Sequence, residues 1–119
     1  MSQQLGFVAE RQAKDYLLAQ GLKFITSNYR CRLGEIDLVM SEKDYIIFVE
    51  VRSRVSAEYG GALASITPAK IRKIIKTATH FLVTKNLYSS HCARFDVISI
   101  QGPESKIEWI KSAFDTDGR

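Results

Sequence analysis

Hydrophobic residues recur with helical spacing at the start of the chain. Over residues 3–20 one stripe is apolar and consists of Leu5, Ala9, Ala13, Tyr16 and Leu17. The opposite side is polar, with Arg11, Lys14 and Asp15. Gly21 follows at the position where a left-handed residue commonly ends a helix. The pattern predicts an amphipathic helix over residues 3–20.

Three segments with strand-like patterns come next, at residues 22–30, 34–41 and 45–52. The first alternates polar and apolar positions, whereas the second (GEIDLVMS) and the third (YIIFVEVR) are mostly apolar. The polar tetrapeptide 42–45 lies between the last two and is typical of a hairpin turn. We therefore expect these two apolar strands to be antiparallel neighbours.

The second half of the chain predicts a loop, a helix and one or two further strands. Residues 53–66 contain two adjacent glycines and several serines, so we expect a long loop there. Thr67 is a suitable cap for a second helix, with Pro68 at its first position. Strands are expected at 93–101 and 106–111. The order of elements predicts one α/β domain over residues 1–114, with a mixed sheet flanked by helices, and a frayed tail over 115–119.

Length and composition favour an ordinary single domain. The chain has 119 residues, of which 45% are hydrophobic and 25% charged. No apolar stretch approaches the roughly 20 residues that a membrane-spanning helix needs, and the first residues do not resemble a secretory signal. We expect a cytoplasmic protein with no membrane partner. Cys31 and Cys92 lack the spacing of a zinc site, and we expect both to be free thiols.

The formal net charge of +4 is distributed unevenly. Basic residues cluster in one half of the chain: Arg30, Arg32, Arg52, Arg54, Lys70, Arg72, Lys73 and Lys76. A clustered positive field attracts nucleic-acid phosphates, which makes nucleic acid a candidate partner. The alternative is a solvated basic helix face with no ligand.

Two acidic residues lie inside the most apolar strands, Asp37 in GEIDLVM and Glu50 in IIFVEVR. Acids are costly in such strands unless they are paired or bind a metal. If Ser41 faces Ile46 across the turn, the same register places Asp37 opposite Glu50 on one face. Two carboxylates so close repel each other unless a cation lies between them, and carboxylate oxygens suit Mg²⁺ or Mn²⁺. This geometry predicts a metal site, and a register slip of one residue would abolish it.

Two further residues are candidates for the same site. Glu10 flanks the apolar stripe of the first helix and can reach the end of a neighbouring sheet; the alternative is an exposed helix glutamate. Arg52 shares the face of Glu50 and can stabilise negative charge on a phosphoryl group; its alternative is a cross-strand ion pair with Glu35, and both can hold. Asp96 is expected to be structural, paired with Arg94 or a helix amide.

Taken in order, these residues resemble the D–(D/E)xK signature of restriction-endonuclease-like nucleases. The element order resembles that of archaeal Holliday-junction resolvases. The fuller match is to the YraN-like family of predicted endonucleases, carried by GEIDL, FVEVR, Tyr59-Gly60-Gly61, Arg94-Phe95-Asp96-Val97 and the segment from Glu108 to Lys111. The resemblance covers nearly the whole chain.

The resemblance implies an αβββαβ core and an endonuclease site. Asp37, Glu50 and the carbonyl of Val51 would hold Mg²⁺ or Mn²⁺, and Glu10 would assist. Arg52 stands where the superfamily usually has lysine, and arginine cannot serve as a general base. DNA, possibly branched, would be the substrate, and two copies of the chain could pair to bind it. Binding would use Arg30, Arg32, Arg54, Tyr59, Lys70, Lys73 and Lys76. The competing interpretation is a nucleic-acid-binding module with a degenerate site.

Overall fold

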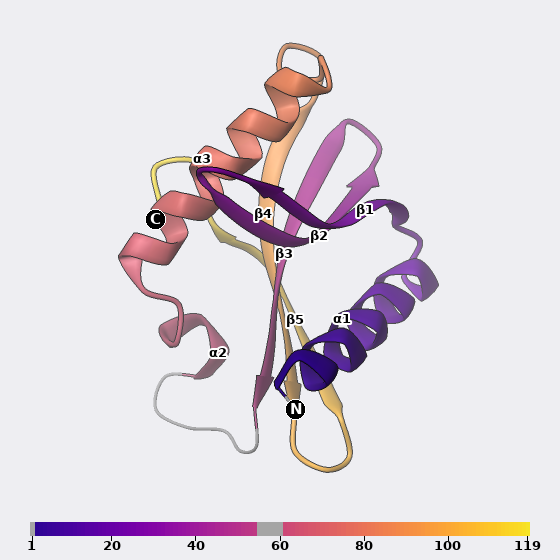
Figure 1. Cartoon of the computed structure of the whole chain (residues 1–119). Coiled ribbons are helices and arrows are strands. Elements are labelled where there is room, and N and C mark those ends of the chain that lie inside the picture. Colours follow the sequence, from indigo (N-terminus) through magenta and orange to yellow (C-terminus); the bar gives the residue numbers. More distant parts are fainter. Residues whose placement is uncertain (1, 55–60) are drawn as a thin grey trace.

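The computed structural model describes the backbone of residues 2–54 and 61–119, and the side chains of 8–54, 61 and 63–119. The elements along the chain are α1 (Ser2–Ala19), β1 (Lys23–Cys31), β2 (Gly34–Glu42), β3 (Tyr45–Arg54), α2 (Gly61–Ala64), α3 (Pro68–Thr84), β4 (Cys92–Gln101) and β5 (Lys106–Phe114) (Figure 1). Apart from the short helix α2, this order matches the predicted succession of helices and strands, with ends shifted by a few residues.

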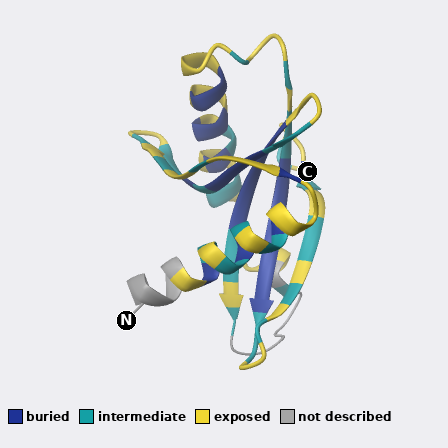
Figure 2. Ribbon diagram, turned by 90° about the vertical axis from the view of Figure 1, so that its right-hand side faces the viewer, coloured by how far each residue is buried: buried dark blue, intermediate teal, exposed yellow. Residues whose placement is uncertain are grey.

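The strands form one five-stranded sheet in the order β1-β2-β3-β4-β5. Strands β3 and β4 are parallel and the other neighbours are antiparallel, so the sheet is mixed. Buried residues gather in the middle of the sheet and on the sides of the helices that face it (Figure 2). Helix α1 covers one face through Ala9, Ala13 and Leu17, and α3 covers the other. The predicted fold class, an α/β core with a mixed sheet flanked by helices, is confirmed.

Helix α3 begins where the sequence predicts. The Thr67 hydroxyl accepts a hydrogen bond from the backbone N–H of Lys70 at 3.1 Å, and Pro68 occupies the first turn. The loop prediction for residues 53–66 is wrong at both ends, because β3 continues to Arg54 and Gly61–Ala64 form a short helix. Residues 55–60, with the candidate Tyr59, lie outside the described residues.

The predicted register between β2 and β3 is confirmed, but the pairing ends early. Ser41 faces Ile46, and the last pair is Leu38 with Val49. Beyond that pair β3 continues beside β4 as far as Arg54, whereas β2 continues beside β1 to its end. Strands β2 and β3 therefore separate beyond Leu38, and we call this separation the fork. The tip of the β1–β2 hairpin crosses from there toward α3 (Figure 1).

Close packing holds the hairpin tip against α3. A methyl group on Gly34 would lie 2.8 Å from the hydroxyl oxygen of Thr77, so only glycine allows this approach. Thr77 is fully buried and donates its hydroxyl hydrogen to the carbonyl of Lys73 at 2.7 Å. The packing of Gly34 against Thr77 therefore holds the hairpin tip in place, away from β3.

Residues 115–119 form a turn in which Asp115 accepts hydrogen bonds from the backbone N–H groups of Asp117 and Arg119; their fraying in solution stays a prediction. In the part of the chain that the structure describes, no helix has the length and apolar character needed to cross a membrane.

Candidate active site

Asp37 lies at the fork of the sheet, one residue beyond the last β2–β3 pair. Its Oδ2 atom accepts a hydrogen bond from the backbone N–H of Val51 at 2.9 Å. The carboxylate thus takes the place of a backbone carbonyl as the acceptor at the point where the strands separate. This contact fixes the direction of the side chain, and the carbonyl of Val51 as a metal ligand stays a prediction.

Asp37 and Glu50 meet where β2 and β3 separate. Glu50 follows two residues after Phe48, which packs in the cluster beneath α3, so Glu50 is on the α3 side of the sheet. The side chains of Asp37 and Glu50 are close enough to hydrogen-bond to each other. Glu50 is buried, with only 7% of its side chain exposed, and Asp37 is half-buried.

Burial dominates the electrostatics of this pair. Burial first, and then the charge of the neighbouring Asp37, raise the pKa of Glu50 from 4.5 to about 7, although the charges of Lys70 and Arg52 oppose the increase. Burial also raises the pKa of Asp37, although the Val51 N–H and the charge of Lys70 oppose the increase. At neutral pH the pair consequently favours taking up either a proton or a cation.

Two basic side chains approach Glu50 from different elements. Nη2 of Arg52 lies 3.1 Å from Oε2 of Glu50, and Nζ of Lys70, from the first turn of α3, lies 3.9 Å from the same oxygen. The sequence predicts Lys70 only as a phosphate ligand. Its contact with Glu50 depends on how α3 packs on the sheet, which the sequence pattern does not show. The alternative ion pair between Arg52 and Glu35 is wrong, since β2 leaves β3 before Glu35 is reached; Glu35 pairs with Arg30 instead.

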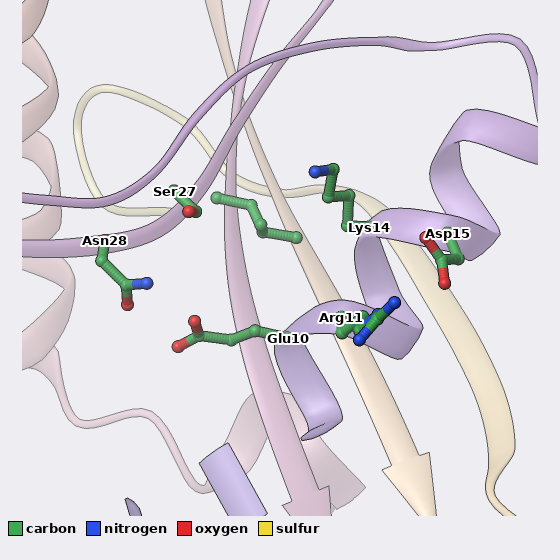
Figure 3. Close-up of a pocket in the computed structure, with 7 residues that line it drawn as sticks. Glu10, Arg11, Lys14, Asp15, Ser27 and Asn28 are labelled. Atoms are coloured by element: carbon green, nitrogen blue, oxygen red, sulfur yellow. The ribbon is translucent and has the colours of Figure 1, made fainter. Parts of the chain in front are cut away.

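Glu10 reaches the same site from α1, through the opening of the fork. Its side chain points away from the neighbouring Arg11 and Lys14 and toward Asn28 of β1 (Figure 3). It interacts with the side chains of Asn28 and Asp37, and burial followed by the charge of Asp37 raises its pKa from 4.5 to about 6. The alternative of a freely exposed helix glutamate is therefore wrong.

Asn28 is a site neighbour that the sequence analysis missed. It has a φ of 52°, and the β1–β2 register includes Ser27 and Tyr29 but not Asn28 itself. Asparagine tolerates this left-handed conformation better than most residues. An asparagine within a predicted strand is a weak signal of such a backbone irregularity, and nothing in the sequence pairs it with Glu10.

The fit of a metal ion depends on the donor atoms of these acids. Among the described residues no three acidic, histidine or cysteine side chains are grouped so that they alone could hold an ion. Asp37 and Glu50 provide carboxylate oxygens, which Mg²⁺ and Mn²⁺ prefer, and Mg²⁺ usually binds through one or two carboxylates together with water and phosphate oxygens. The residues therefore fit an ion that is completed by water and substrate.

The predicted phosphate-binding residues fall into separate groups. Arg30, Lys70 and Lys73 line one cavity between the hairpin tip and α3, whereas Lys76 lines a different one beside Val83. Arg32 is exposed in the hairpin turn and Arg54 ends β3. The structure thus brings only part of the predicted basic cluster close to the acids.

Asp96 belongs to a separate, structural cluster. Its carboxylate accepts hydrogen bonds from Arg94 at 3.0 and 2.8 Å, from Nε1 of Trp109 at 2.9 Å and from the backbone N–H of Ser112 at 3.0 Å. The predicted pairing with Arg94 is confirmed, while the amide belongs to a strand rather than a helix. Cys31 and Cys92 are free thiols, as expected.

The fold and site define a mixed α/β protein whose five-stranded sheet, flanked by helices, is compatible with a restriction-endonuclease-like core. The chain belongs to the uncharacterised protein family UPF0102, whose model matches residues 9–100. This confirms the YraN-like part of the resemblance, and the matched range includes Glu10, Asp37, Glu50 and Arg52.

Relatives from several bacteria match almost the full chain. A UPF0102 protein of Legionella pneumophila (strain Philadelphia 1) is 50% identical over 115 residues, which cover 97% of this chain and 98% of the relative. A UPF0102 protein of Coxiella burnetii (strain RSA 331) is 42% identical over 117 residues, covering 98% and 97%. One from Pseudomonas putida (strain W619) is 42% identical over 113 residues and covers 92% of each chain.

Proposed function

We propose that this protein is a metal-dependent endonuclease that hydrolyses phosphodiester bonds in nucleic acid, with DNA, including branched DNA, as the substrate. The observation that carries the proposal is the contact of Asp37 with the buried Glu50 at the fork of the sheet. Two acids in mutual contact, with pKa values raised by burial, form a site whose charge is better balanced by a divalent cation than by solvent.

The chemistry of phosphodiester hydrolysis matches this arrangement. A divalent ion bound there would supply an activated water and offset charge on the phosphoryl oxygens. The N–H of Val51 holds Asp37 in place, so one carboxylate oxygen remains available. Glu10 has a pKa near 6, so it can accept a proton close to neutral pH.

Arg52 supplies positive charge rather than proton transfer. Its guanidinium stays protonated, so it can stabilise the extra negative charge of a pentavalent phosphoryl group but cannot deprotonate water. Lys70 adds a second cation from α3. The lysine of the superfamily motif could combine proton transfer with charge stabilisation. In this proposal Glu10 transfers the proton, and Arg52 and Lys70 stabilise the negative charge.

Cleavage tests the proposal. Purified protein is incubated with labelled branched, duplex and single-stranded DNAs and with RNA, in Mn²⁺, Mg²⁺ or EDTA. We expect cleavage of at least one substrate that needs the metal and disappears in Asp37→Ala, while Asp44→Ala, an exposed turn residue, cleaves normally. Intact substrates in every metal condition would reject the endonuclease.

One observation favours a second candidate, a nucleic-acid-binding module without catalysis. Arg52 and Lys70 already lie 3.1 and 3.9 Å from Glu50, so they can neutralise it without any metal. The prediction of this alternative is DNA binding of equal strength in Mg²⁺ and EDTA, with the DNA left intact. Pairing of two copies on DNA and a cytoplasmic location stay predictions under either function.

A further inference from the structure

A cavity of about 380 Å³ lies between the end of the β1–β2 hairpin and α3, and it is linked to the acidic pair through Lys70. The end of the β1–β2 hairpin forms one wall, with Arg30 and Cys31 from β1 and Glu35 from β2, and the start of α3 forms the other with Lys70 and Lys73. The close approach of Gly34 to Thr77 holds the two walls together. The cavity is therefore a consequence of the fork in the sheet.

The charge of this cavity is positive. Three basic side chains, Arg30, Lys70 and Lys73, line it against one acid, Glu35, which is already paired with Arg30. Lys70 also lies 3.9 Å from Glu50, so a single side chain borders both the cavity and the acids. A group bound in the cavity would be adjacent to whatever is bound at Asp37 and Glu50.

The geometry points to a phosphate-binding subsite in this cavity, which holds a backbone phosphate of the nucleic-acid strand next to the phosphate at Asp37 and Glu50. The inference rests on the proposed function, because that function places the neighbouring phosphate at Asp37 and Glu50. Lysine and arginine are the usual ligands of phosphate oxygens, and such contacts position the strand without reading its sequence.

The structure separates this subsite from the rest of the basic helix. Lys73 and Lys76 are both exposed and lie one turn apart on α3, yet only Lys73 lines the subsite. Lys76 borders an apolar cavity formed with Leu33, Ile75 and Val83. Charge alone would assign both lysines to nucleic acid, whereas the subsite assigns this role to Lys73.

Binding by matched variants tests the difference. Fluorescence anisotropy of a labelled DNA strand is measured in EDTA, so that binding is read without cleavage. We expect Lys73→Gln to weaken binding about 3- to 10-fold and to lower the salt dependence by about one ion, with Lys76→Gln within about twofold of the unmodified protein. Equal effects of the two substitutions, or no DNA binding at all, would overturn the subsite.

The two free cysteines provide a second, independent measurement on the unmodified chain. Cys31 lines the subsite. Cys92 lies at the start of β4, where it pairs with Tyr45, and it is five residue pairs along the strand from Glu50 and Val97. Each thiol is labelled with a maleimide, and the labelling rate of each cysteine is measured with and without DNA. DNA is expected to slow labelling of Cys31 and to leave Cys92 unchanged. Equal protection of both, or of neither, contradicts the inference.

These measurements distinguish the subsite from the nuclease itself. If DNA protects Cys31 and Lys73→Gln weakens binding, but no metal supports cleavage, the subsite stands and the catalytic proposal fails. If the protein cleaves DNA while Cys31 stays unprotected and Lys73→Gln binds normally, the nuclease stands and the subsite is rejected.

Discussion

The backbone N–H of Val51 donates to Oδ2 of Asp37 at 2.9 Å, across the point where β2 and β3 stop pairing. This bond joins the two strands beyond their last backbone pair, and it holds the Asp37 side chain beside Glu50. The same separation of strands opens a path for Glu10 from α1 and for Lys70 from α3. The fork is thus the feature that assembles the site.

Glu50→Gln should stabilise the protein at neutral pH. The pKa of Glu50 is about 7 in the folded chain against a reference value of 4.5, so between these pH values the folded state binds more protons than the unfolded state. The free energy of unfolding then falls as pH rises through this range, and Glu10 contributes in the same direction. Replacing Glu50 removes most of this dependence and adds about 1–3 kcal/mol at about pH 8.

Urea denaturation at about pH 5 and about pH 8 measures this effect, because the difference between the two pH values reports the linked protons. Glu108→Gln is the control, since it makes the same substitution at an exposed acid on β5, outside the acidic pair. A Glu50→Gln protein that loses stability at both pH values would show that Glu50 is held by its ion pairs rather than destabilised by burial.

Substitutions of Arg52 separate an electrostatic role from a proton-transfer role. Arg52→Gln removes the cation beside Glu50, and we expect kcat to fall about 100-fold with little change in KM. Arg52→Lys keeps the charge, and we expect activity within about tenfold of the unmodified protein. Steady-state cleavage rates measure both. If lysine is as damaging as glutamine, the geometry of the guanidinium matters more than its charge.

Asp96→Asn should cost stability without affecting the site. Asp96 is buried and its carboxylate accepts four hydrogen bonds, two of them from Arg94. Removing its charge leaves Arg94 with a weakened partner, so we expect a loss of about 2–4 kcal/mol. Thermal denaturation gives the loss, and DNA binding of the folded protein should be unchanged. Weaker DNA binding by a folded Asp96→Asn protein would place Asp96 in the interface after all.

Much of the fold follows from local patterns in the sequence. The apolar stripe over the first helix, the Thr67-Pro68 start of α3 and the polar turn between β2 and β3 each predict one element correctly. The turn length also predicts the register, which places Asp37 and Glu50 on one face because side chains alternate along a strand. The acidic pair is thus the part of the site that a sequence can predict.

The rest of the site depends on long-range packing. The register predicts that Arg52 faces Glu35, but pairing ends at Leu38, because the β1–β2 hairpin turns away to contact α3. Neither the left-handed Asn28 beside Glu10 nor the approach of Lys70 to Glu50 follows from spacing along the chain. Such contacts join elements that lie far apart in the sequence, and periodicity carries no information about them.

Binding of Mn²⁺, followed by electron paramagnetic resonance, tests the central claim most directly. Asp37→Asn keeps an oxygen to accept the hydrogen bond from Val51 and so preserves the fork, while it removes the charge that would bind the ion. Asp44→Asn serves as the control. We predict that the unmodified protein and Asp44→Asn bind Mn²⁺, and that Asp37→Asn binds it at least about tenfold more weakly. Equal Mn²⁺ binding by Asp37→Asn, or none by the unmodified protein at millimolar metal, would contradict the proposed metal site.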